Sequence, residues 1–285
     1  MRFTFVILLF LNFAANAQMI IKAHANYRPL AQPVVNLLLD DYPNAAAAYS
    51  LRKLDKDYTG NAIRVRRSND NREQDIGFVG NDLDTTSLKT FVGVNSGFVT
   101  TWYDQSGNAR NATQTTAANQ PRIVNAGTVE RVNTKPSIFL DGSNDFFAFT
   151  STRTSANDIY YVINTTDNSF AIHTNDNSGG FGYLATQSSA NTGLYGNYGT
   201  PTLYVNNTLR TPANRGDIYT YYNGITTLTS VINANLNNLI WQNTPRIGAV
   251  YLFAGRISEF VLFDVSNSSN RTGIETNINS YYGIY

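Results

Sequence analysis

The segment from residue 139 to residue 147 reads FLDGSNDFF, and it decides the class of fold. Two runs of large apolar residues flank a turn of Asp, Gly, Ser and Asn, whose side chains bond their own backbone. Strands that follow one another across so short a turn indicate an all-β protein rather than βαβ units. A second segment, GRISEFVLFD at 255–264, has one alternating face and predicts another strand, which a polar loop follows.

Short apolar or alternating runs of the same kind recur along the chain, with turn residues between them at roughly regular spacing. The pattern predicts an all-β sandwich of two packed antiparallel sheets over about residues 60–265. The predicted strands are 63–67, 98–103, 137–140, 146–150, 158–164, 169–173, 182–185, 202–205, 218–222, 226–232, 246–248 and 256–264.

Short helices are predicted near the two ends of the chain. The segment 44–56 has four consecutive alanines and apolar residues at one-turn spacing, with Asn44 as its N-cap. The segment 270–282 also repeats apolar residues at helical spacing, and the apolar run 34–42 predicts a shorter helix.

The composition excludes several classes of function. The 285 residues carry 21 Lys and Arg against 20 Asp and Glu, a net charge of +1, which does not attract nucleic acid. The absence of cysteine excludes disulfides, thiolate metal sites and cysteine nucleophiles. Two histidines are too few for a multi-histidine metal site, so the sequence requires no cofactor.

The N-terminal 17 residues have the pattern of a secretory signal peptide. Arg2 precedes an apolar run over 3–13, and Ala15-Asn16-Ala17 forms a small-x-small cleavage site. The alternative is an uncleaved N-terminal anchor; no later segment is apolar enough to span a membrane. We therefore expect a signal peptide at 1–17, a linker with a short helical preface at 18–43, one sandwich domain at 44–285, and a protein that is secreted or displayed on a cell or virion surface.

Three segments in this order resemble the concanavalin A-like lectin and glucanase superfamily, especially its laminin-G-like branch: WYDQSGN at 102–108, the turn at 139–147 and the late strand at 255–264. A closer resemblance, over about 45–125 and again around 245–285, is to the catalytic domain of α-L-arabinofuranosidase B. It is carried by AAYSLRKL at 47–54, YTG at 58–60, VRRS at 65–68 and YDQSG at 103–107. The resemblance implies a jelly-roll sandwich that handles sugars, and similar openings occur in phage virion and bacterial surface proteins.

The resemblance also implies a test for activity. A retaining glycosidase needs a carboxylate nucleophile and a carboxylic acid about 5–5.5 Å apart. In the family these are a Glu on a central strand and an Asp before the late strand, but the segments 192–212 and 247–254 contain no carboxylate. The spare candidates are Asp167, Asp176 and Asp217. The sequence therefore favours a non-catalytic glycan-recognising, surface or virion protein; an active α-L-arabinofuranosidase is the alternative, and a purely structural protein is a third class.

Each residue that could bind a ligand could also have a purely structural role. Tyr195, Tyr198, Tyr204 and Trp241 could stack on sugar rings, or they could simply pack, because the chain has 18 tyrosines. Asp141 and Asp145 could bind calcium, which prefers oxygen ligands, or could order their own turn. The expected partner is a polysaccharide or cell-surface glycan, and the oligomeric state stays open.

Overall fold

The computed structural model describes residues 36–149, 158–166, 173–174, 202–232, 246–247 and 253–285. Most of its strands join one 16-stranded sheet in the order β15-β19-β13-β7-β6-β8-β12-β20-β14-β18-β16-β17, and β1, β2, β3 and β9 branch from this path. The strands of this sheet are β1 (Ala45–Ser50), β2 (Ile63–Arg67), β3 (Glu73–Ile76), β6 (Gly97–Trp102), β7 (Ala112–Thr113), β8 (Arg122–Asn125), β9 (Thr128–Val129), β12 (Ile138–Asp141), β13 (Phe147–Phe149), β14 (Asp158–Thr165), β15 (His173–Thr174), β16 (Thr202–Val205), β17 (Thr208–Arg210), β18 (Thr226–Ile232), β19 (Arg246–Ile247) and β20 (Ala254–Phe263).

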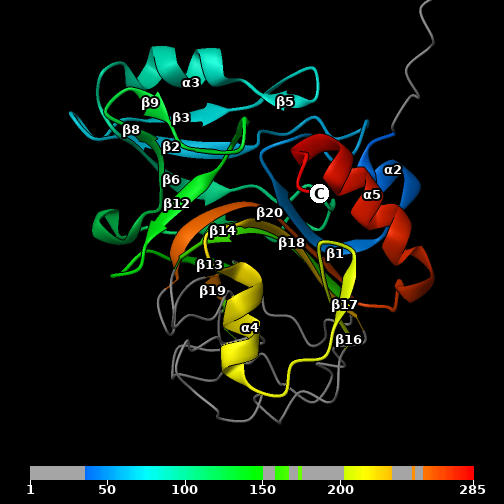
Figure 1. Ribbon diagram of the computed structural model, residues 1–285. Helices are drawn as coiled ribbons and strands as arrows, with labels where there is room; N and C mark the ends of the chain where they lie inside the picture. The colour runs from blue at the N-terminus through cyan, green and yellow to red at the C-terminus, as the bar shows by residue number, and fades with distance from the viewer. Residues whose placement is uncertain (1–35, 150–157, 167–172, 175–201, 233–245, 248–252) are drawn as a thin grey trace, which may run out of the picture. The chain divides into compact units, whose positions relative to one another are not determined.

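Two further hairpins and a few short helices complete the described chain. The hairpins are β4 (Phe78–Val79) with β5 (Asp82–Leu83), and β10 (Arg131–Val132) with β11 (Lys135–Pro136). The helices are α2 (Leu38–Asp41), α3 (Thr85–Val92), α4 (Arg215–Tyr222) and α5 (Arg271–Tyr282), with single 3₁₀ turns at Ala117–Asn119 and Ser268–Asn270. Figure 1 shows α3 above β2 and β3, and α5 on the opposite side of β20 from them. The predicted all-β architecture is confirmed.

Strand β20 organises the sheet. Its first half pairs with β12 and its second half with β1 along one edge, while β14 follows almost its whole length on the other edge. The named ladders of the described strands are all antiparallel, as the turn spacing predicts. This arrangement places a ten-residue strand in the middle of the fold, and strands from three earlier parts of the chain pair with its two edges.

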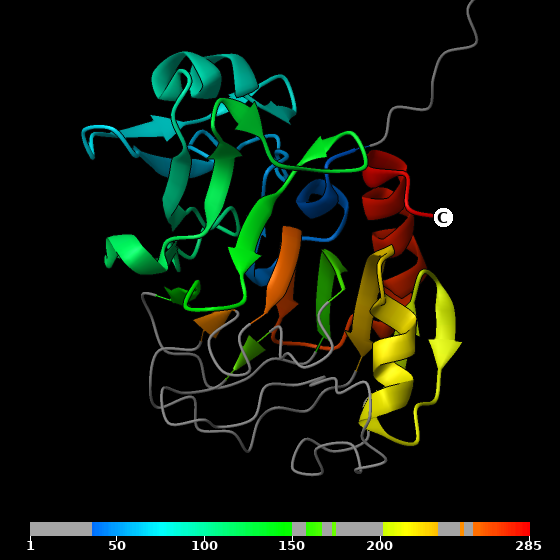
Figure 2. The same cartoon turned by 60° about the vertical axis from the view of Figure 1, so that its left-hand side comes forward.

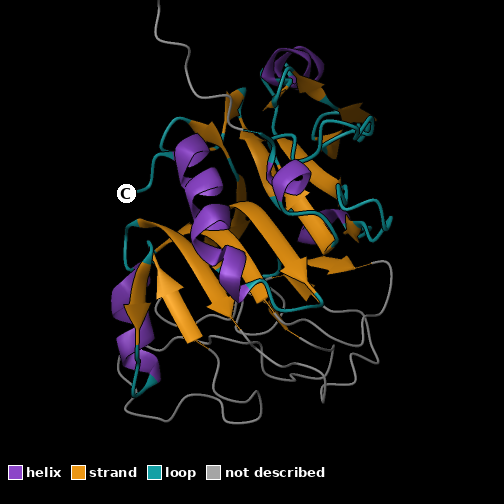
Figure 3. Cartoon of the chain, turned by 90° about the vertical axis from the view of Figure 1, so that its right-hand side faces the viewer, coloured by secondary structure: helices purple, strands orange, loops and turns teal. Residues whose placement is uncertain are grey.

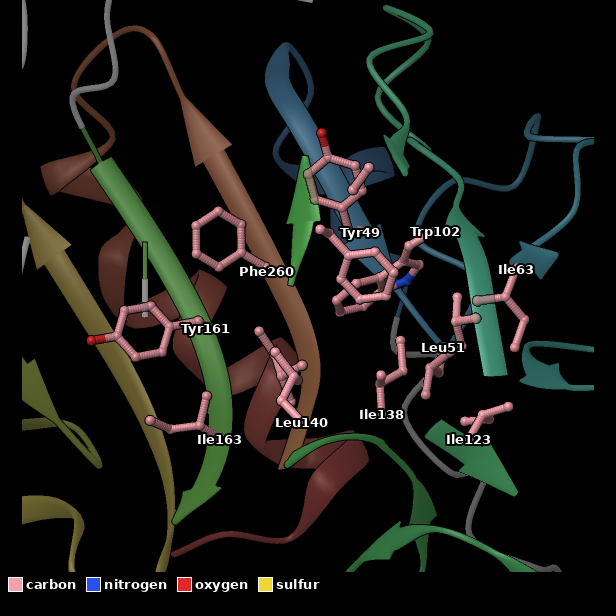
Figure 4. Packing of buried hydrophobic residues seen from close by; sticks show 14 of the residues in the cluster. Tyr49, Leu51, Ile63, Trp102, Ile123, Ile138, Leu140, Tyr161, Ile163 and Phe260 are labelled. Carbon is pink, nitrogen blue, oxygen red and sulfur yellow. The ribbon is translucent and has the colours of Figure 1, made fainter. Parts of the chain in front are cut away.

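Two hydrophobic clusters lie on the two faces of this sheet. The larger one includes Trp102, Ile123, Ile138, Phe260 and Tyr161, which come from different strands and are labelled in Figure 4. The smaller cluster lies under α5, which crosses β14, β18 and β20 in Figure 3. Ile274 and Ile278 fall one turn apart on the buried side of α5, so the predicted C-terminal helix is confirmed.

The predicted helix over 44–56 is wrong. Ala45–Ser50 is strand β1, and all six of its residues are buried. Some of its side chains enter the larger cluster (Ala46, Ala47 and Tyr49) and others the smaller one (Ala45 and Ala48). Both faces of the strand are therefore covered, and the helix propensity of alanine is outweighed. Periodicity alone cannot distinguish a strand buried on both faces from a buried helix. Asn44 has φ 64°, and it turns the chain into the strand instead of capping a helix.

The predicted strand over 218–222 is also wrong, because this segment lies in α4. The side chain of Asn214 accepts a hydrogen bond from the backbone N–H of Asp217, and the Asp217 carboxylate accepts one from the backbone N–H of Asn214. This reciprocal cap nucleates a helix in a segment whose isoleucine and tyrosines favour a strand. In the sequence, the three-residue spacing of Asn214 and Asp217 was the feature that could have predicted the start of this helix.

Within the described segments, no helix has the length and apolar character needed to cross a membrane.

Candidate functional site

A cleft of about 720 Å³ opens where α5 ends and leaves part of the sheet uncovered. Its floor is formed by Asn164 at the end of β14 and Thr226 at the start of β18, which lie opposite each other in the ladder. Its walls are the last turn of α5 with Gly283 and Ile284, the turn of the β10–β11 hairpin, and the β16–β17 turn. Figure 2 shows the open ends of β14, β18 and β20 beside α4 and the β16–β17 hairpin.

The cleft is lined mainly by amides and hydroxyls. Asn133 donates to the backbone oxygen of Tyr282 at 3.1 Å, Asn164 donates to the hydroxyl of Thr226 at 3.3 Å, and the Asn206 side chain accepts from the backbone N–H of Leu228 at 2.9 Å. Each amide therefore uses one side of its hydrogen-bonding capacity to hold its own position. Within the described part of the chain the other side of each amide is left for a polar ligand.

Two of these asparagines have left-handed backbone conformations. Asn133 has φ 52° and Asn206 has φ 50°, which asparagine tolerates better than most side chains. Both lie in tight turns between strands, so the turns bring their amides to the cleft. The sequence prediction did not include Asn133, Asn164 or Asn206 among the sugar-binding residues. The only sequence feature that could have pointed to these asparagines was their position in or beside turns between apolar strand segments.

Tyr281 forms an aromatic wall of the cleft. Its hydroxyl donates to Asp82 at 2.5 Å, the ammonium of Lys135 lies 3.8 Å from its ring centroid, and the ring of Tyr282 meets it edge-on at 4.8 Å. Burial, followed by the hydrogen bond to Asp82, raises the pKa of Tyr281. The ring therefore stays neutral and held in place at ordinary pH.

Behind the cleft lies a buried ion pair between Arg52 and Glu259. The Arg52 guanidinium donates to both carboxylate oxygens, at 2.8 and 3.0 Å, and the Tyr282 hydroxyl lies 3.2 Å from the same carboxylate. Burial by itself would lower the pKa of Arg52, but the charge and hydrogen bonds of Glu259 outweigh it and the pKa is raised. The pair ties β1 and β20 to the last turn of α5, and so fixes the wall of the cleft.

All four glutamates of the chain lie in the described part and form ion pairs with arginines. Glu259 pairs with Arg52 and is fully buried; Glu275 pairs with Arg271 and is 1% exposed. Glu130 bridges Arg122 at 2.7 Å and Arg256 at 2.8 Å, and Glu73 pairs with Arg64 at 2.6 Å. The glutamate side chains thus serve the scaffold, and among the described lining residues of the cleft none is acidic.

Of the predicted catalytic and stacking residues, the structure describes Asp217 and Tyr204. Asp217 caps α4 and accepts hydrogen bonds from the backbone N–H groups of Ala213 and Asn214. Tyr204 on β16 lies beneath the guanidinium of Arg271, 3.7 Å from the ring centroid, and packs beside the cluster under α5. The other predicted residues lie outside the described residues: Asp167, Asp176, Tyr195, Tyr198 and Trp241.

The predicted calcium ligands lie together in the turn after β12. One carboxylate oxygen of Asp141 accepts from the backbone N–H of Ser143 at 2.7 Å and of Asn144 at 3.3 Å, and Asp145 accepts from the backbone N–H of Asp141 at 3.0 Å. Burial, followed by the charge of Asp141, raises the pKa of Asp145 to about 7. The described residues hold no group of three or more metal-ligating side chains. The turn bonds itself, and calcium binding stays a prediction.

Comparison with known proteins identifies the family. The sequence model described as alpha-L-arabinofuranosidase B, catalytic, matches residues 40–238. No curated protein matches the chain.

Solved structures show the same fold at low identity. One is a crystal structure of an arabinofuranosidase complexed with arabinofuranosyl-alpha-1,2-xylobiose, at a TM-score of 0.54 and 15% identity. Another is a point mutant of a GH54 α-L-arabinofuranosidase soaked with 4-nitrophenyl α-L-arabinofuranoside, at a TM-score of 0.50 and 16% identity. Each match covers 82% of this chain and 62% of the other, so this chain spans less than two thirds of those proteins.

Proposed function

The chain belongs to the alpha-L-arabinofuranosidase B catalytic family, and from this membership we propose that it binds arabinofuranosyl-bearing polysaccharide without hydrolysing it. Arabinofuranose is the sugar of the ligands that the two similar structures name, and we propose it for this chain as well. We also propose that it acts outside the cell or on a cell or virion surface, as the N-terminal pattern indicates.

One observation carries the non-hydrolytic part of the proposal. Every glutamate side chain is held by an arginine, and three of the four are at most 8% exposed. A retaining mechanism needs a carboxylate that can reach the anomeric carbon of a sugar, with a second carboxyl about 5–5.5 Å away. A buried, paired glutamate cannot approach a sugar without leaving its arginine uncompensated.

The binding part rests on the chemistry of the cleft. Amide and hydroxyl groups donate to and accept from sugar hydroxyls, and Tyr281 adds an aromatic side chain to the lining. Most of these groups are already held by bonds to the scaffold, so little ordering entropy is lost when a sugar binds. A site of this kind recognises a neutral sugar without needing a metal.

The alternative is an active α-L-arabinofuranosidase, and two observations favour it. Family membership itself is one. The other is Asp145, whose pKa of about 7 lies in the range of a general acid. In that case the partner carboxylate would come from residues such as Asp167 or Asp176.

One experiment tests both functions. The purified chain is titrated with methyl α-L-arabinofuranoside by calorimetry, and it is separately incubated with 4-nitrophenyl α-L-arabinofuranoside. We expect binding that Asn164→Ala weakens about tenfold, a matched substitution of the exposed Asn125 that leaves it unchanged, and no release of nitrophenol. Turnover by the wild type that Asp145→Asn, Asp167→Asn or Asp176→Asn abolishes would establish the hydrolase instead.

A further inference from the structure

Two walls of the cleft are joined by a side chain that lies outside it, the carboxylate of Asp82. Asp82 belongs to the separate β4–β5 hairpin and is not one of the residues that line the cleft. Its Oδ1 atom accepts a hydrogen bond from the hydroxyl of Tyr281 at 2.5 Å and lies 3.4 Å from the ammonium of Lys135. One carboxylate oxygen therefore connects the β4–β5 hairpin, the β10–β11 hairpin and α5.

The two partners of Asp82 belong to different walls. Tyr281 is in the last turn of α5, and Lys135 follows Asn133 and Thr134, which form the turn of the β10–β11 hairpin. The ammonium of Lys135 also lies 3.8 Å from the ring centroid of Tyr281, so the two partners contact each other as well as the carboxylate. The spacing between these two walls therefore depends on what Asp82 holds.

The backbone of Asp82 is itself anchored. It forms a β-bridge with Arg52, and the neighbouring backbone N–H of Lys53 donates to the backbone oxygen of Asn81 at 2.9 Å. Arg52 is in turn fixed by its buried ion pair with Glu259. The carboxylate of Asp82 thus extends toward the cleft walls from a point that is tied to the core of the protein.

The contact between Asp82 and Lys135 is ionic, whereas the lining of the cleft is not. Their side chains are 60% and 28% exposed, so dissolved salt reaches the pair and screens it. Among the described residues that line the cleft, none carries a charge. An uncharged ligand in this cleft has no ion pair of its own for salt to screen. A salt-dependent affinity for such a ligand would therefore report on the pair outside the cleft.

We propose that Asp82 is a positioning residue of the cleft, which sets the spacing of two walls through Tyr281 and Lys135 and so makes the affinity for an uncharged sugar depend on ionic strength. The proposal rests on the proposed function, because it takes the cleft as the sugar site. Loss of the Asp82 charge leaves the Tyr281 hydroxyl with a weaker acceptor and Lys135 without its counterion. The hairpin and the end of α5 then open more often.

The first measurement needs no ligand. Amide hydrogen exchange of the full chain is compared between the wild type and Asp82→Asn over residues 131–136 and 279–285. We expect exchange in both segments to be at least about threefold faster in the variant, because both lose the contact that holds them. Asp82→Glu keeps a carboxylate and should restore most of the protection.

The second measurement is a calorimetric titration with methyl α-L-arabinofuranoside at low and high salt. Between about 0.01 M and about 1 M sodium chloride we expect the wild type to lose about twofold in affinity. Asp82→Asn should bind about fivefold more weakly than the wild type at low salt and show no salt dependence. Lys135→Gln should also abolish the salt dependence while it keeps the bond between Tyr281 and Asp82. In a Tyr281→Phe background, Asp82→Asn should cost less affinity than in the wild type, since the shared bond is already gone.

Asp70→Asn is the matched control. Asp70 also pairs with two cations, Arg67 at 2.7 Å and Arg72 at 3.5 Å, and neither of them lines the cleft. The substitution removes the same charge, and we expect it to leave the exchange of both segments and the affinity unchanged. Equal effects of Asp70→Asn and Asp82→Asn would assign the change to net charge and overturn the positioning role.

The outcomes separate this proposal from the proposed function. Exchange that is unchanged in both segments of Asp82→Asn, or an affinity and salt dependence equal to those of the wild type, would overturn the role of Asp82. Faster exchange in both segments of a chain that binds no arabinofuranoside at either salt concentration would refute the proposed function and retain Asp82 as the residue that positions the two walls.

Discussion

Arg52 and Glu259 form a two-point ion pair inside the protein, with N–O distances of 2.8 and 3.0 Å and exposed fractions of 4% and 0%. Arg52 follows β1 near the start of the domain and Glu259 is in the central strand, 207 residues later. Arg52 also donates to Asn277 on α5 at 2.9 Å. One guanidinium therefore connects three elements that are distant in the sequence.

Substitution of one partner of this pair should strongly destabilise the protein. Glu259→Gln leaves a buried guanidinium without its countercharge, and we expect a loss of about 3–5 kcal/mol in the free energy of unfolding. Urea unfolding measures this loss. The control is Arg64→Gln, which breaks the exposed pair with Glu73 and should cost about 0–1 kcal/mol. A similar small cost for both variants would show that the buried pair does not hold the three elements together.

The pH dependence of stability should include a contribution from Asp145. Its pKa is raised from 3.8 to about 7 in the folded protein, so between these values the folded state binds a proton that the unfolded state has lost. Stability from this group is therefore present below about pH 4 and is lost as the pH rises to about 7. Asp145→Asn should match the wild type at pH 4 and be more stable at pH 8.

We expect a gain of about 1–2 kcal/mol for Asp145→Asn at pH 8, less than the full shift implies because solvent screens the turn. Thermal melts over this pH range measure it. Asp141→Asn removes the neighbouring charge and should give part of the same gain. A wild type and an Asp145→Asn variant with parallel pH profiles would contradict the raised pKa.

Calcium binding at Asp141 and Asp145 has a direct test. An ion that binds only the folded state stabilises it by about 2.7 kcal/mol when its concentration is 100 times Kd. We expect millimolar calcium to raise the melting temperature at pH 8, where Asp145 is ionised, and Asp141→Asn to abolish the rise. Identical melting curves in calcium and in chelator would contradict calcium binding and show that the turn is held only by its own hydrogen bonds.

Asp217 should matter for stability and not for sugar chemistry. Asp217→Ala removes half of the capping box of α4, and we expect a cost of about 1 kcal/mol in denaturant unfolding. Binding of methyl α-L-arabinofuranoside should be unchanged. The exposed Thr220 on the same helix offers a comparison, since Thr220→Ala leaves the cap intact. Loss of binding in Asp217→Ala, with α4 still folded by circular dichroism, would restore Asp217 as a functional residue.

The local strand pattern could be read without the structure where one face of a strand is buried and the other is wet. The predictions for 63–67 and 202–205 coincide with β2 and β16. The prediction for 226–232 coincides with β18, which is buried on both faces but is rich in threonine, valine and isoleucine, residues that favour a strand. In these strands the residue pattern that predicts the strand lies within the strand itself or in the turn beside it. The pattern failed for 45–50, where both faces of the strand are covered, and for 218–222, where a cap outweighs propensity.

The sequence by itself determined the β class, the final helix, the two strands around the turn at 139–147 and the membership of a sugar-handling family, because these depend on local periodicity and local motifs. The tertiary structure decided the pairing: β12 and β13 follow one another across that turn yet bond to different strands, β12 to β8 and β20, and β13 to β7 and β19. It also decided the cleft, whose floor joins Asn164 at the end of β14 to Thr226 at the start of β18. Cross-strand register is a long-range property that no local pattern carries, and it is register that brings these side chains to one face.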